Sequence, residues 1–466
     1  MKRIVRKAGW GGALSLAAVL TLGGCAHNVA SLQEATKPLA KETPKADSFV
    51  SPHETGKVSD DWIAAFGDPT LVKLVKEAQK NNPDLTVAAA RIERAAALMR
   101  LSESGIYPRI DVTGNFTDRD GGNKDRAFFG PTISWVPDVW GRVANIVAAD
   151  REAMRSLAAD YAWARQSLAG DTARIWFRLN ADRVLREFLD EVVKIQEEAL
   201  RVAKEREAIG AGTKRDVHMV SAMTEESKEM RQSFVSREKL DAHALEILLG
   251  RYPGESIAPK GLVAVPAPVP SGLPADLLNR RPDLVAARYR VASAFHNEKA
   301  TELLKLPSFN FRFQAGYDHV EDTVVKLIGS LFLPVIDNRE IDAYIAAATA
   351  EQKAAIANYR SVVLRAYREV EDALTKERGF AIRYDYLATM EKEYKKAYDM
   401  TMESYKIGEG TIIDVLIAQG KWIDARIQRV QMQLNRLQNR VNLHLALGGS
   451  FDKKPAWNEN RMYNER

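Results

Sequence analysis

The sequence predicts a mainly helical chain with two β-hairpins, built from two copies of one structural repeat. Three observations support this fold class. Short motifs return at a nearly constant offset of 197 to 199 residues. Two pairs of segments alternate apolar and polar residues, as β-strands do, and a long helical pattern without proline follows each pair. A repeat of this length indicates a duplicated domain rather than an array of units of about 20–50 residues.

The two copies are aligned by motifs that contain turn-forming or helix-breaking residues. Pro-Asp-Leu begins at Pro83 and at Pro282, and Gly-x-Gly-Thr-x-x-Asp-Val begins at Gly210 and at Gly408. Prolines between these motifs return as well, namely Pro108 and Pro137 as Pro307 and Pro334. Because the spacing is nearly constant, few insertions separate the copies. We place the repeats at 61–254 and 274–451, with a proline-rich linker at 255–273.

Residues 1–24 are predicted to be a lipoprotein signal peptide. Four cations precede a short apolar stretch, and Leu22-Gly23-Gly24 then leads to the only cysteine, Cys25. The pattern resembles a bacterial lipobox, which implies cleavage before Cys25 and its acylation; the alternative is an ordinary core cysteine. We expect residues 25–60 to be a lipidated, polar N-terminal tether without a periodic core face. Residues 452–466 read as a polar C-terminal tail.

Charge and motif content argue against nucleic-acid binding and catalysis. The formal net charge is +5, and the predicted signal peptide carries four cations and no acidic residue, which leaves +1 for the remainder. The seven histidines show no metal-ligand spacing, and the chain contains neither a P-loop nor a Gly-x-Ser-x-Gly motif. We therefore expect no catalytic residue, no metal and no cofactor.

The first repeat begins with a helix and continues into strands. Asp68-Pro69 predicts a helix start, because aspartate is a favoured N-cap and proline a favoured first helical residue. The helical pattern pauses at Asn82-Pro83 and resumes from Leu85 to about residue 106. Strand-like alternation then covers about 110–117 and 128–136, although Pro131 argues against the second strand.

The second repeat shows a cleaner strand pattern. Aromatic residues alternate with polar ones over 309–317, and a partner strand is expected at about 324–333. Strands of about 9–11 residues are long enough to cross a bilayer when tilted. Four strands are too few to close a membrane barrel, so spanning would require oligomers, and a trimer would supply twelve. Two ordinary hairpins on a soluble core would fit the pattern equally well.

Each hairpin is followed by a long helix and a return helix. The pairs are expected at about 141–209 with 213–249, and at 340–407 with 411–447. Apolar residues at three-four spacing along them indicate coiled coil. A helix of roughly 68 residues is on the order of 100 Å long at a rise of 1.5 Å per residue.

These features together resemble the TolC-like outer-membrane efflux proteins, in particular the lipidated branch that serves resistance-nodulation-division pumps. The resemblance covers 62 to about 451. Its motifs are Phe66-x-Asp68-Pro69-x-Leu71, Asn82-Pro83-Asp84-Leu85, Asp138-Val139-Trp140-Gly141-Arg142, Arg280-Arg281-Pro282-Asp283-Leu284, Asp414-Val415-Leu416-x-Ala418-Gln419 and Leu447-Gly448-Gly449. Each motif alone is weak, but the order and spacing of the set make it specific.

The resemblance implies a homotrimer with a 12-stranded β-barrel in the outer membrane, continued by a long coiled-coil α-barrel through the periplasm. It implies strand–helix junctions at Pro108, Pro137, Pro307 and Pro334. It also implies tips that contact a periplasmic adaptor (a membrane fusion protein), at Gly210, Gly212, Thr213, Gly408, Gly410 and Thr411. The adaptor would connect the trimer to a proton-driven inner-membrane pump, and outer-membrane lipids would surround the barrel. Plain helix hairpins are the alternative for the tips.

Relatives close the periplasmic end with a ring of acidic residues. Asp414 matches one gate position, and Asp216 is its equivalent in the first repeat. A second aspartate of some relatives is replaced here by Ile417, which puts a double acidic ring in doubt. An aspartate in the first turn of a helix is also favoured by the helix dipole, so capping is the alternative for both residues.

The expected function is a passive outer-membrane exit duct for small toxic compounds such as drugs, solvents or metal ions. A duct for type I protein secretion shares the fold and stays open as an alternative. A lipid-anchored coiled-coil scaffold would explain the lipobox and the helices. It would leave unexplained why strands, prolines and long helices recur at one offset.

Overall fold

The computed structural model describes residues 29–44, 46–52, 54, 56, 61–117, 126–254, 257–318, 322–335 and 339–449. The predicted signal peptide, Cys25 and the predicted C-terminal tail lie outside these residues. The chain divides into two compact units, one of Met1–Pro44, Ala90–Ala159 and Val285–Val362, the other of Lys45–Ala89, Asp160–Leu284 and Val363–Arg466. None of the described helices combines the length and apolar character needed to cross a bilayer.

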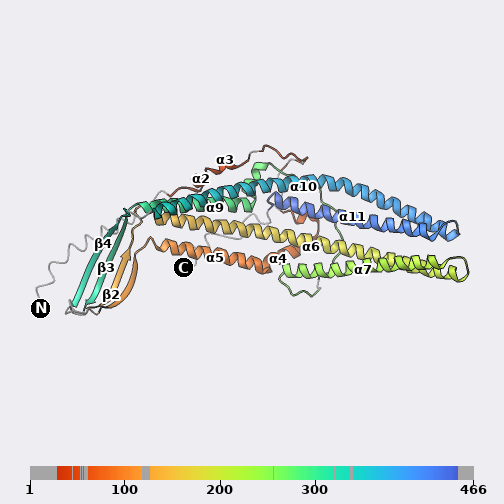
Figure 1. Cartoon of the computed structure of the whole chain (residues 1–466), viewed down its shortest axis with the longest axis horizontal. Coiled ribbons are helices and arrows are strands. Elements are labelled where there is room, and N and C mark those ends of the chain that lie inside the picture. The colour runs from red at the N-terminus through yellow and green to blue at the C-terminus, as the bar shows by residue number, and fades with distance from the viewer. Residues whose placement is uncertain are drawn as a thin grey trace. The chain divides into compact units, whose positions relative to one another are not determined.

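The first unit contains the strands, in the segments where alternation predicts them. Two hairpins are formed, by β1 (Arg109–Thr117) with β2 (Arg126–Trp135), and by β3 (Ser308–Asp318) with β4 (Asp322–Phe332). They join through β2 and β3 into one antiparallel sheet of order β1-β2-β3-β4 (Figure 1). The hairpins of the two repeats therefore pair with each other, which the sequence did not predict.

Pro131 lies inside β2, a central strand, at a break in the ladder. Phe129 pairs with Tyr317 and Thr132 pairs with Gln314, while the two residues between them make no ladder pair with β3. Proline has no N–H to donate there. A Cβ on Gly130 would lie 2.2 Å from the carbonyl oxygen of Ala315, so the two backbones approach too closely for a side chain. The strand forms despite its proline because the ladder skips this point.

Helices α4 (Pro69–Asn81) and α5 (Pro83–Ser104) precede the first hairpin. The Asp68 carboxylate accepts the N–H groups of Thr70 and Leu71 at 2.9 and 3.2 Å, which confirms the predicted helix start. The Asn82 side chain accepts the N–H groups of Asp84 and Leu85. Because of this cap, α5 begins at Pro83, two residues earlier than predicted.

Each hairpin leads into a long helix and a return helix. In the first repeat these are α6 (Arg142–Ala208) and α7 (Lys214–Leu248), and in the second α10 (Glu340–Ile407) and α11 (Ile412–Ala446) (Figure 1). The second repeat also contains η3 (Pro274–Asp276), α8 (Leu277–Arg280), α9 (Pro282–Glu302) and η4 (Leu303–Lys305). The bounds agree with the predicted helices to within about two residues, the usual uncertainty of helix ends.

The second unit has an apolar core in which the start of the first repeat meets helices α4, α5, α6, α7 and α11. Trp62 and Phe66, the latter in η2 (Ala64–Phe66), pack with Phe177 of α6 and His444 of α11. The Trp62 and His444 rings stack with centroids 5.4 Å apart. The core continues along the coiled coil through Leu185, Leu189, Ile423, Val430 and Leu437. This arrangement explains why apolar residues recur at helical spacing in both repeats.

The segment predicted as a featureless tether has structure of its own. It contains α2 (Leu32–Ala35) and α3 (Leu39–Glu42), with Ala35 and Leu39 buried. Further along, the Glu371 carboxylate of α10 accepts the N–H groups of Val50 and Ser51 at 2.7 and 2.9 Å. The segment thus packs through isolated apolar residues, which give no periodic signal in a sequence.

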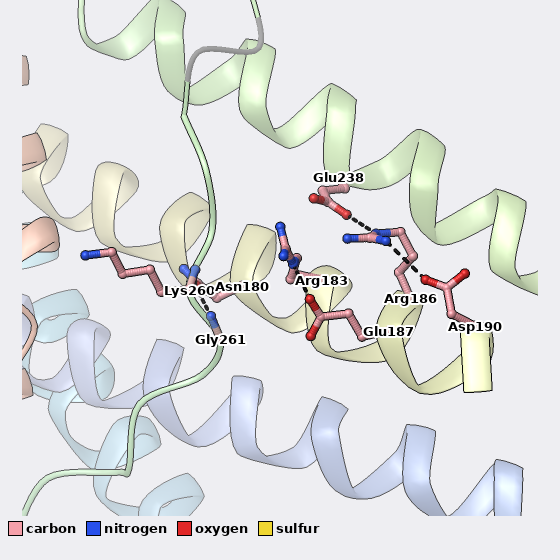
Figure 2. A network of polar contacts seen from close by, with 8 residues as sticks. All are labelled: Asn180, Arg183, Arg186, Glu187, Asp190, Glu238, Lys260 and Gly261. Carbon is pink, nitrogen blue, oxygen red and sulfur yellow. Dashed lines mark hydrogen bonds and ion pairs between the residues drawn. The ribbon is translucent and has the colours of Figure 1, made fainter. Parts of the chain in front are cut away.

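The proline-rich linker is held by polar side chains of two helices. The amide oxygen of Asn180, a residue that is 1% exposed, accepts the N–H groups of Lys260 and Gly261, each at 2.8 Å (Figure 2). The Gln433 amide donates to the carbonyl of Val263 at 3.0 Å. These contacts fix the linker on α6 and α11, beyond the stiffness that its prolines provide.

Candidate channel elements: the sheet, the junctions and the helical tips

The sheet has one apolar face, and that face is exposed. Side chains alternate across a strand, so the register assigns alternate residues of all four strands to one face. The exposed apolar residues of this face are Ile110, Val112, Phe116, Phe129, Phe311, Phe313, Tyr317, Val325, Leu327 and Leu331. Their exposed fractions run from 36% to 73%. An apolar surface across four strands, without cover in one chain, marks an interaction surface.

The opposite face of the sheet is mostly polar. The Thr113 hydroxyl donates to that of Thr132 at 3.1 Å, and Gln314 donates to the same oxygen at 3.4 Å. Arg109 and Asp111 form an ion pair at 2.9 Å. Arg312 lies on the same face through its register with Ser134. The two faces therefore suit two different solvents, an apolar one and water.

The predicted junction prolines lie at the ends of the strands. Pro108 and Pro307 immediately precede β1 and β3, while Pro137 and Pro334 follow two residues after β2 and β4. Proline lacks an N–H group, so it ends ladder pairing without leaving a donor unpaired. Their role as junctions between membrane and periplasm stays a proposal.

The first junction is fixed by the motif Asp-Val-Trp-Gly-Arg. The Asp138 carboxylate accepts the N–H groups of Val143 and Ala144 at 2.9 and 2.8 Å and so caps α6. Gly141 has φ of +78°, a left-handed conformation that glycine adopts without strain. The Trp140 indole donates to the carbonyl of Pro307 at 2.6 Å, which ties this motif to the start of β3. Sequence reasoning noted the motif but not this capping role.

The Gly-x-Gly-Thr motifs form the turns between each long helix and its return helix. Gly210 and Gly408 have φ of +75° and +86°, the left-handed conformation that ends a helix. At Gly212 and Gly410, an added Cβ would meet the preceding helix at 3.2 and 3.4 Å. The predicted tight helix reversal is thus confirmed, with different reasons for the first and second glycine. Contact with an adaptor remains a proposal.

Both candidate gate aspartates take part in helix capping. The hydroxyl oxygens of Thr213 and Thr411 each accept the N–H of the aspartate three residues on, at 3.2 Å. Asp216 in turn accepts the Thr213 backbone N–H at 3.1 Å, and Asp414 accepts the Thr411 hydroxyl at 2.6 Å. Asp414 is exposed and Asp216 is half-buried. Capping therefore accounts for both aspartates within one chain, and gating stays a proposal.

The two turns lie beside each other. A small apolar cluster combines Ala203 of α6, Val220 of α7 and Tyr398 of α10 with Ile412, Val415 and Leu416 of α11. The Arg206 guanidinium lies 4.7 Å from the centre of the Tyr405 ring and donates to the Tyr405 carbonyl at 3.3 Å. One cation thus links the last turns of the two long helices.

Polar contacts along the coiled coil align α6 with α7. Arg186 bridges Glu238 at 2.7 Å and Asp190 at 3.2 Å (Figure 2). The buried Asp182 carboxylate pairs with Arg237 at 2.8 Å, and burial raises the pKa of Asp182 to about 6 against the opposing effect of Arg237. Opposite charges at matched heights favour one register of the two helices.

One buried polar cluster, around Arg281, was not predicted, although its motif stands in the sequence. Arg281, which is 1% exposed, bonds Asp283 and Glu369, each at 2.8 Å, and the carbonyl of Ala446 at 3.2 Å. Its guanidinium lies 5.0 Å from the centre of the Trp163 ring. The motif Arg-Arg-Pro-Asp directly precedes a helix, and it places the carboxylate of Asp283 two residues after Arg281. This nearby carboxylate is the one partner of Arg281 that the sequence indicates. Its remaining partners come from distant helices and could not be read from the sequence.

The family model of outer membrane efflux proteins matches residues 74–242 and 273–449. The two matched ranges fall in the two repeats and together cover most of the chain. The chain belongs to the outer membrane efflux protein family. The predicted family resemblance is confirmed, and the protein is an outer-membrane efflux channel of the kind that works with efflux pumps, not an enzyme.

Two curated relatives illustrate the range of the family. The chain is 24% identical over 468 residues to the solvent efflux pump outer membrane protein SrpC of Pseudomonas putida, with 94% of this chain and 98% of that protein covered. It is 26% identical over 426 residues to the pyoverdine export outer membrane protein OpmQ of Pseudomonas aeruginosa, with 84% and 87% covered. The names of these relatives differ in what is exported, solvent for the first and pyoverdine for the second.

Solved structures share the fold. The Campylobacter jejuni CmeC outer membrane channel aligns with a TM-score of 0.80 at 22% identity and covers 91% of this chain and 95% of that one. The open state of the Neisseria gonorrhoeae MtrE outer membrane channel aligns with a TM-score of 0.79 at 23% identity, with 89% and 98% covered. The likeness extends over both repeats and shows the fold alone.

Proposed function

We propose that the protein is the outer-membrane exit duct of a tripartite efflux system. It would form a homotrimer that passively conducts small toxic compounds from a periplasmic adaptor and a proton-driven inner-membrane pump to the cell exterior. The observation that carries the proposal is the sheet, with one exposed apolar face and two edge strands, β1 and β4, that each have one partner among the described strands.

Three copies would close such sheets into a barrel of twelve strands. Closure pairs every edge, turns the apolar faces to lipid and encloses the polar faces around water. The long helices would continue the duct as an α-barrel, and the coiled-coil pattern of both repeats supports this part. One experiment tests the membrane-spanning β-strands, the trimer and the α-barrel together. The purified protein is reconstituted, the mass of the complex is measured by native mass spectrometry, and its conductance is recorded.

Matched substitutions on the two faces make that test sharper. Val325→Asp puts a charge on the apolar face, at a side chain that is 67% exposed in one chain. Asn310→Asp puts the same charge on the polar face. We expect only Val325→Asp to prevent assembly of a conducting trimer, since a carboxylate in lipid is destabilising. Normal insertion of Val325→Asp would show that the faces are assigned the wrong way round or that the sheet lies outside lipid.

The helical tips are proposed as the contact site for the adaptor. Thr411 caps α11, so a cysteine is better placed at exposed Glu409 in the same turn. Photo-crosslinking from Glu409→Cys in cells should capture the adaptor of a proton-driven pump. Tyr252→Cys, at a side chain that is 88% exposed beyond the far end of α7, should capture none. Capture of a type I exporter's adaptor would move the function to protein secretion.

Asp414 and Asp216 are proposed to gate the periplasmic end. Three Asp414 carboxylates around one axis would form an acidic constriction, and the cations that it attracts would help to hold the periplasmic end closed. Asp414→Ala should therefore raise the conductance of the isolated trimer, with a smaller effect for Asp216→Ala. Thr411→Val removes the same capping contact but keeps the charge, so it is the control. Equal conductance in wild type and Asp414→Ala would leave Asp414 with its capping role alone.

Acylation of Cys25 is proposed as a second membrane anchor. Two or three acyl chains hold a protein stably at a membrane, and a closed barrel would hold it independently. Cys25→Ser should therefore abolish acylation, measured by mass spectrometry, while the trimer still forms. Loss of the trimer in this variant would make the lipid essential for assembly.

A further inference from the structure

A groove of about 240 Å³ lies at the first strand–helix junction, within the unit that contains the sheet. Its walls come from the segment between β2 and α6, from η4 and from the end of β4. Its apolar lining includes Val136, Val139, Val143, Leu304, Leu306 and Phe332. Val139 is 43% exposed and Phe332 is 68% exposed. The groove is thus open, apolar and not filled by the chain itself.

Two opposite charges line the same groove. The Asp138 carboxylate already accepts two backbone N–H groups and retains capacity for another donor, because a carboxylate offers about four lone-pair sites. Arg142 is exposed and forms no ion pair within the described part of the chain. The cation of nearby Lys305 is paired with Asp342 at 2.8 Å. The groove therefore offers one free cation and one carboxylate.

The side chain of Trp140 completes the groove. Its N–H is held by the Pro307 carbonyl, and the ring is 44% exposed. A fixed, exposed indole is typical of the interface between lipid tails and water. Pro307, which lines the groove, immediately precedes β3, so the groove adjoins the end of the sheet that we propose lies in the bilayer.

We propose that this groove binds a zwitterionic aminophospholipid of the ethanolamine type. The phosphate would bond Arg142, the ammonium group would bond Asp138, and one acyl chain would lie on the apolar lining. The pair of opposite charges is the reason to prefer a zwitterion, since an anionic phosphoglycerol lipid would have no group for Asp138. This inference rests on the proposed function, because it needs the sheet to lie in a membrane.

The test uses the full-length lipoprotein in nanodiscs with equal amounts of phosphatidylethanolamine and phosphatidylglycerol. After release into mild detergent, native mass spectrometry counts the lipids retained on each trimer. Wild type should retain the ethanolamine lipid preferentially. Arg142→Gln should lower its retention about tenfold, the effect of losing one charge-assisted hydrogen bond. Arg100→Gln, an exposed arginine of the same unit outside the groove, should behave as wild type.

A second variant tests the zwitterion itself. In Asp138→Asn the amide oxygen can still accept the helix N–H groups, so α6 stays capped while the charge is lost. The preference for the ethanolamine lipid should then fall to parity with the glycerol lipid. An unchanged preference would overturn the headgroup assignment.

Other outcomes separate this inference from the proposed function. Conducting trimers that retain no lipid, or equal retention in Arg142→Gln and Arg100→Gln, would overturn the lipid site and leave the duct intact. If Cys25→Ser gains a retained lipid that the acylated protein lacks, the chain's own acyl group occupies the groove instead. Failure to form trimers or to conduct would count against the proposed function.

Discussion

The two repeats make the same connection with different chemistry. Asn82 and Arg281 occupy equivalent positions, one residue before the prolines that begin α5 and α9. Asn82 donates to the carbonyl of Leu248 at 3.0 Å, and Arg281 donates to that of Ala446 at 3.2 Å. These two carbonyls are also equivalent, 198 residues apart. In each repeat, one side chain thus ties the end of the return helix to the start of another.

The difference lies in what surrounds the donor. Asn82 is neutral and needs few partners, whereas the buried charge of Arg281 requires Asp283, Glu369 and the face of Trp163. Removing one member of a buried ion cluster leaves the others uncompensated. The same hydrogen bond thus differs between the repeats. With Asn82 it is a contact of one neutral side chain, whereas with Arg281 it is part of an ion cluster that joins several helices.

The largest loss of stability is expected from removing the two donor side chains, those of Arg281 and Asn82. Arg281→Ala should lower the free energy of unfolding by about 3 kcal/mol, the lower part of the range for a broken buried ion pair, because Glu369 is 39% exposed and can be hydrated. Asn82→Ala should cost about 1 kcal/mol, as for a lost helix cap. Denaturant titration of the solubilised protein measures both. Equal losses would mean that the charged cluster adds nothing to the shared hydrogen bond.

The next largest loss of stability is expected at the glycines that end the return helices. Gly250 and Gly448 have φ of +71° and +70°, and an added Cβ would lie 2.6 Å from the Asn81 carbonyl oxygen and 2.9 Å from the Arg280 carbonyl carbon. Substitution by alanine should cost about 2 kcal/mol in each repeat, from backbone strain and contact. Gly379→Ala is the control, since this helical glycine has open space around it. That variant should gain up to about 1 kcal/mol.

One buried titratable group in each repeat, His444 and Asp182, should change the free energy of unfolding in opposite directions as pH falls. Burial lowers the pKa of His444 to about 3 from 6.5, so the unfolded state binds more protons between these values and stability falls as pH falls. The slope is at most about 1.4 kcal/mol per pH unit. Asp182, with its pKa raised to about 6 from 3.8, binds its proton more tightly when folded, so its contribution rises as pH falls from 6 to 3.8.

Single substitutions separate these two responses. His444→Leu should flatten the loss of stability in acid, and Asp182→Asn should steepen it. The measurement is the denaturant midpoint at a series of pH values from 7 to 4, with wild type beside each variant. A parallel shift of the whole curve, without a change of slope, would assign both effects to packing rather than to proton binding.

The smallest effects are expected at the turns, where the repeats are most alike. Thr213→Ala and Thr411→Ala each remove one N-cap and should each cost about 1 kcal/mol. Hydrogen exchange of the first turn of α7 and of α11 would report the loss locally. Substitution by serine, which keeps the hydroxyl, is the control. A clearly larger effect at Thr411 would separate the two tips and support a special role for the second.

Features that depend on neighbours in the sequence were predictable. The helix start at Asp68, the strands in their alternating segments and the Gly-x-Gly-Thr turns all follow from contacts within a few residues. The capping pair of Thr411 and Asp414 is of this kind as well. Such contacts leave a signal in spacing and composition that a single sequence carries.

Features that depend on distant contacts were not predictable. The pairing of β2 with β3, the ion pair of Arg281 with Glu369 and the contact of Glu371 with the N-terminal segment join residues that are more than 80 apart in the sequence. Nothing in the local pattern identifies such partners. The resemblance and the repeat indicate where the candidate site lies, whereas its contacts, including the capping by Asp138, are seen only in the structure.

The seam between β2 and β3 has a consequence for the order of folding. Phe129 pairs with Tyr317, so a stretch of chain about as long as one repeat separates the two strands, whereas each hairpin closes locally and quickly. During synthesis, β2 is therefore an open edge until β3 exists, and open edges invite pairing with the wrong chain. Pro131 leaves that temporary edge without a donor at its centre. The proline that weakens β2 as a strand thus protects it while its partner is still being made.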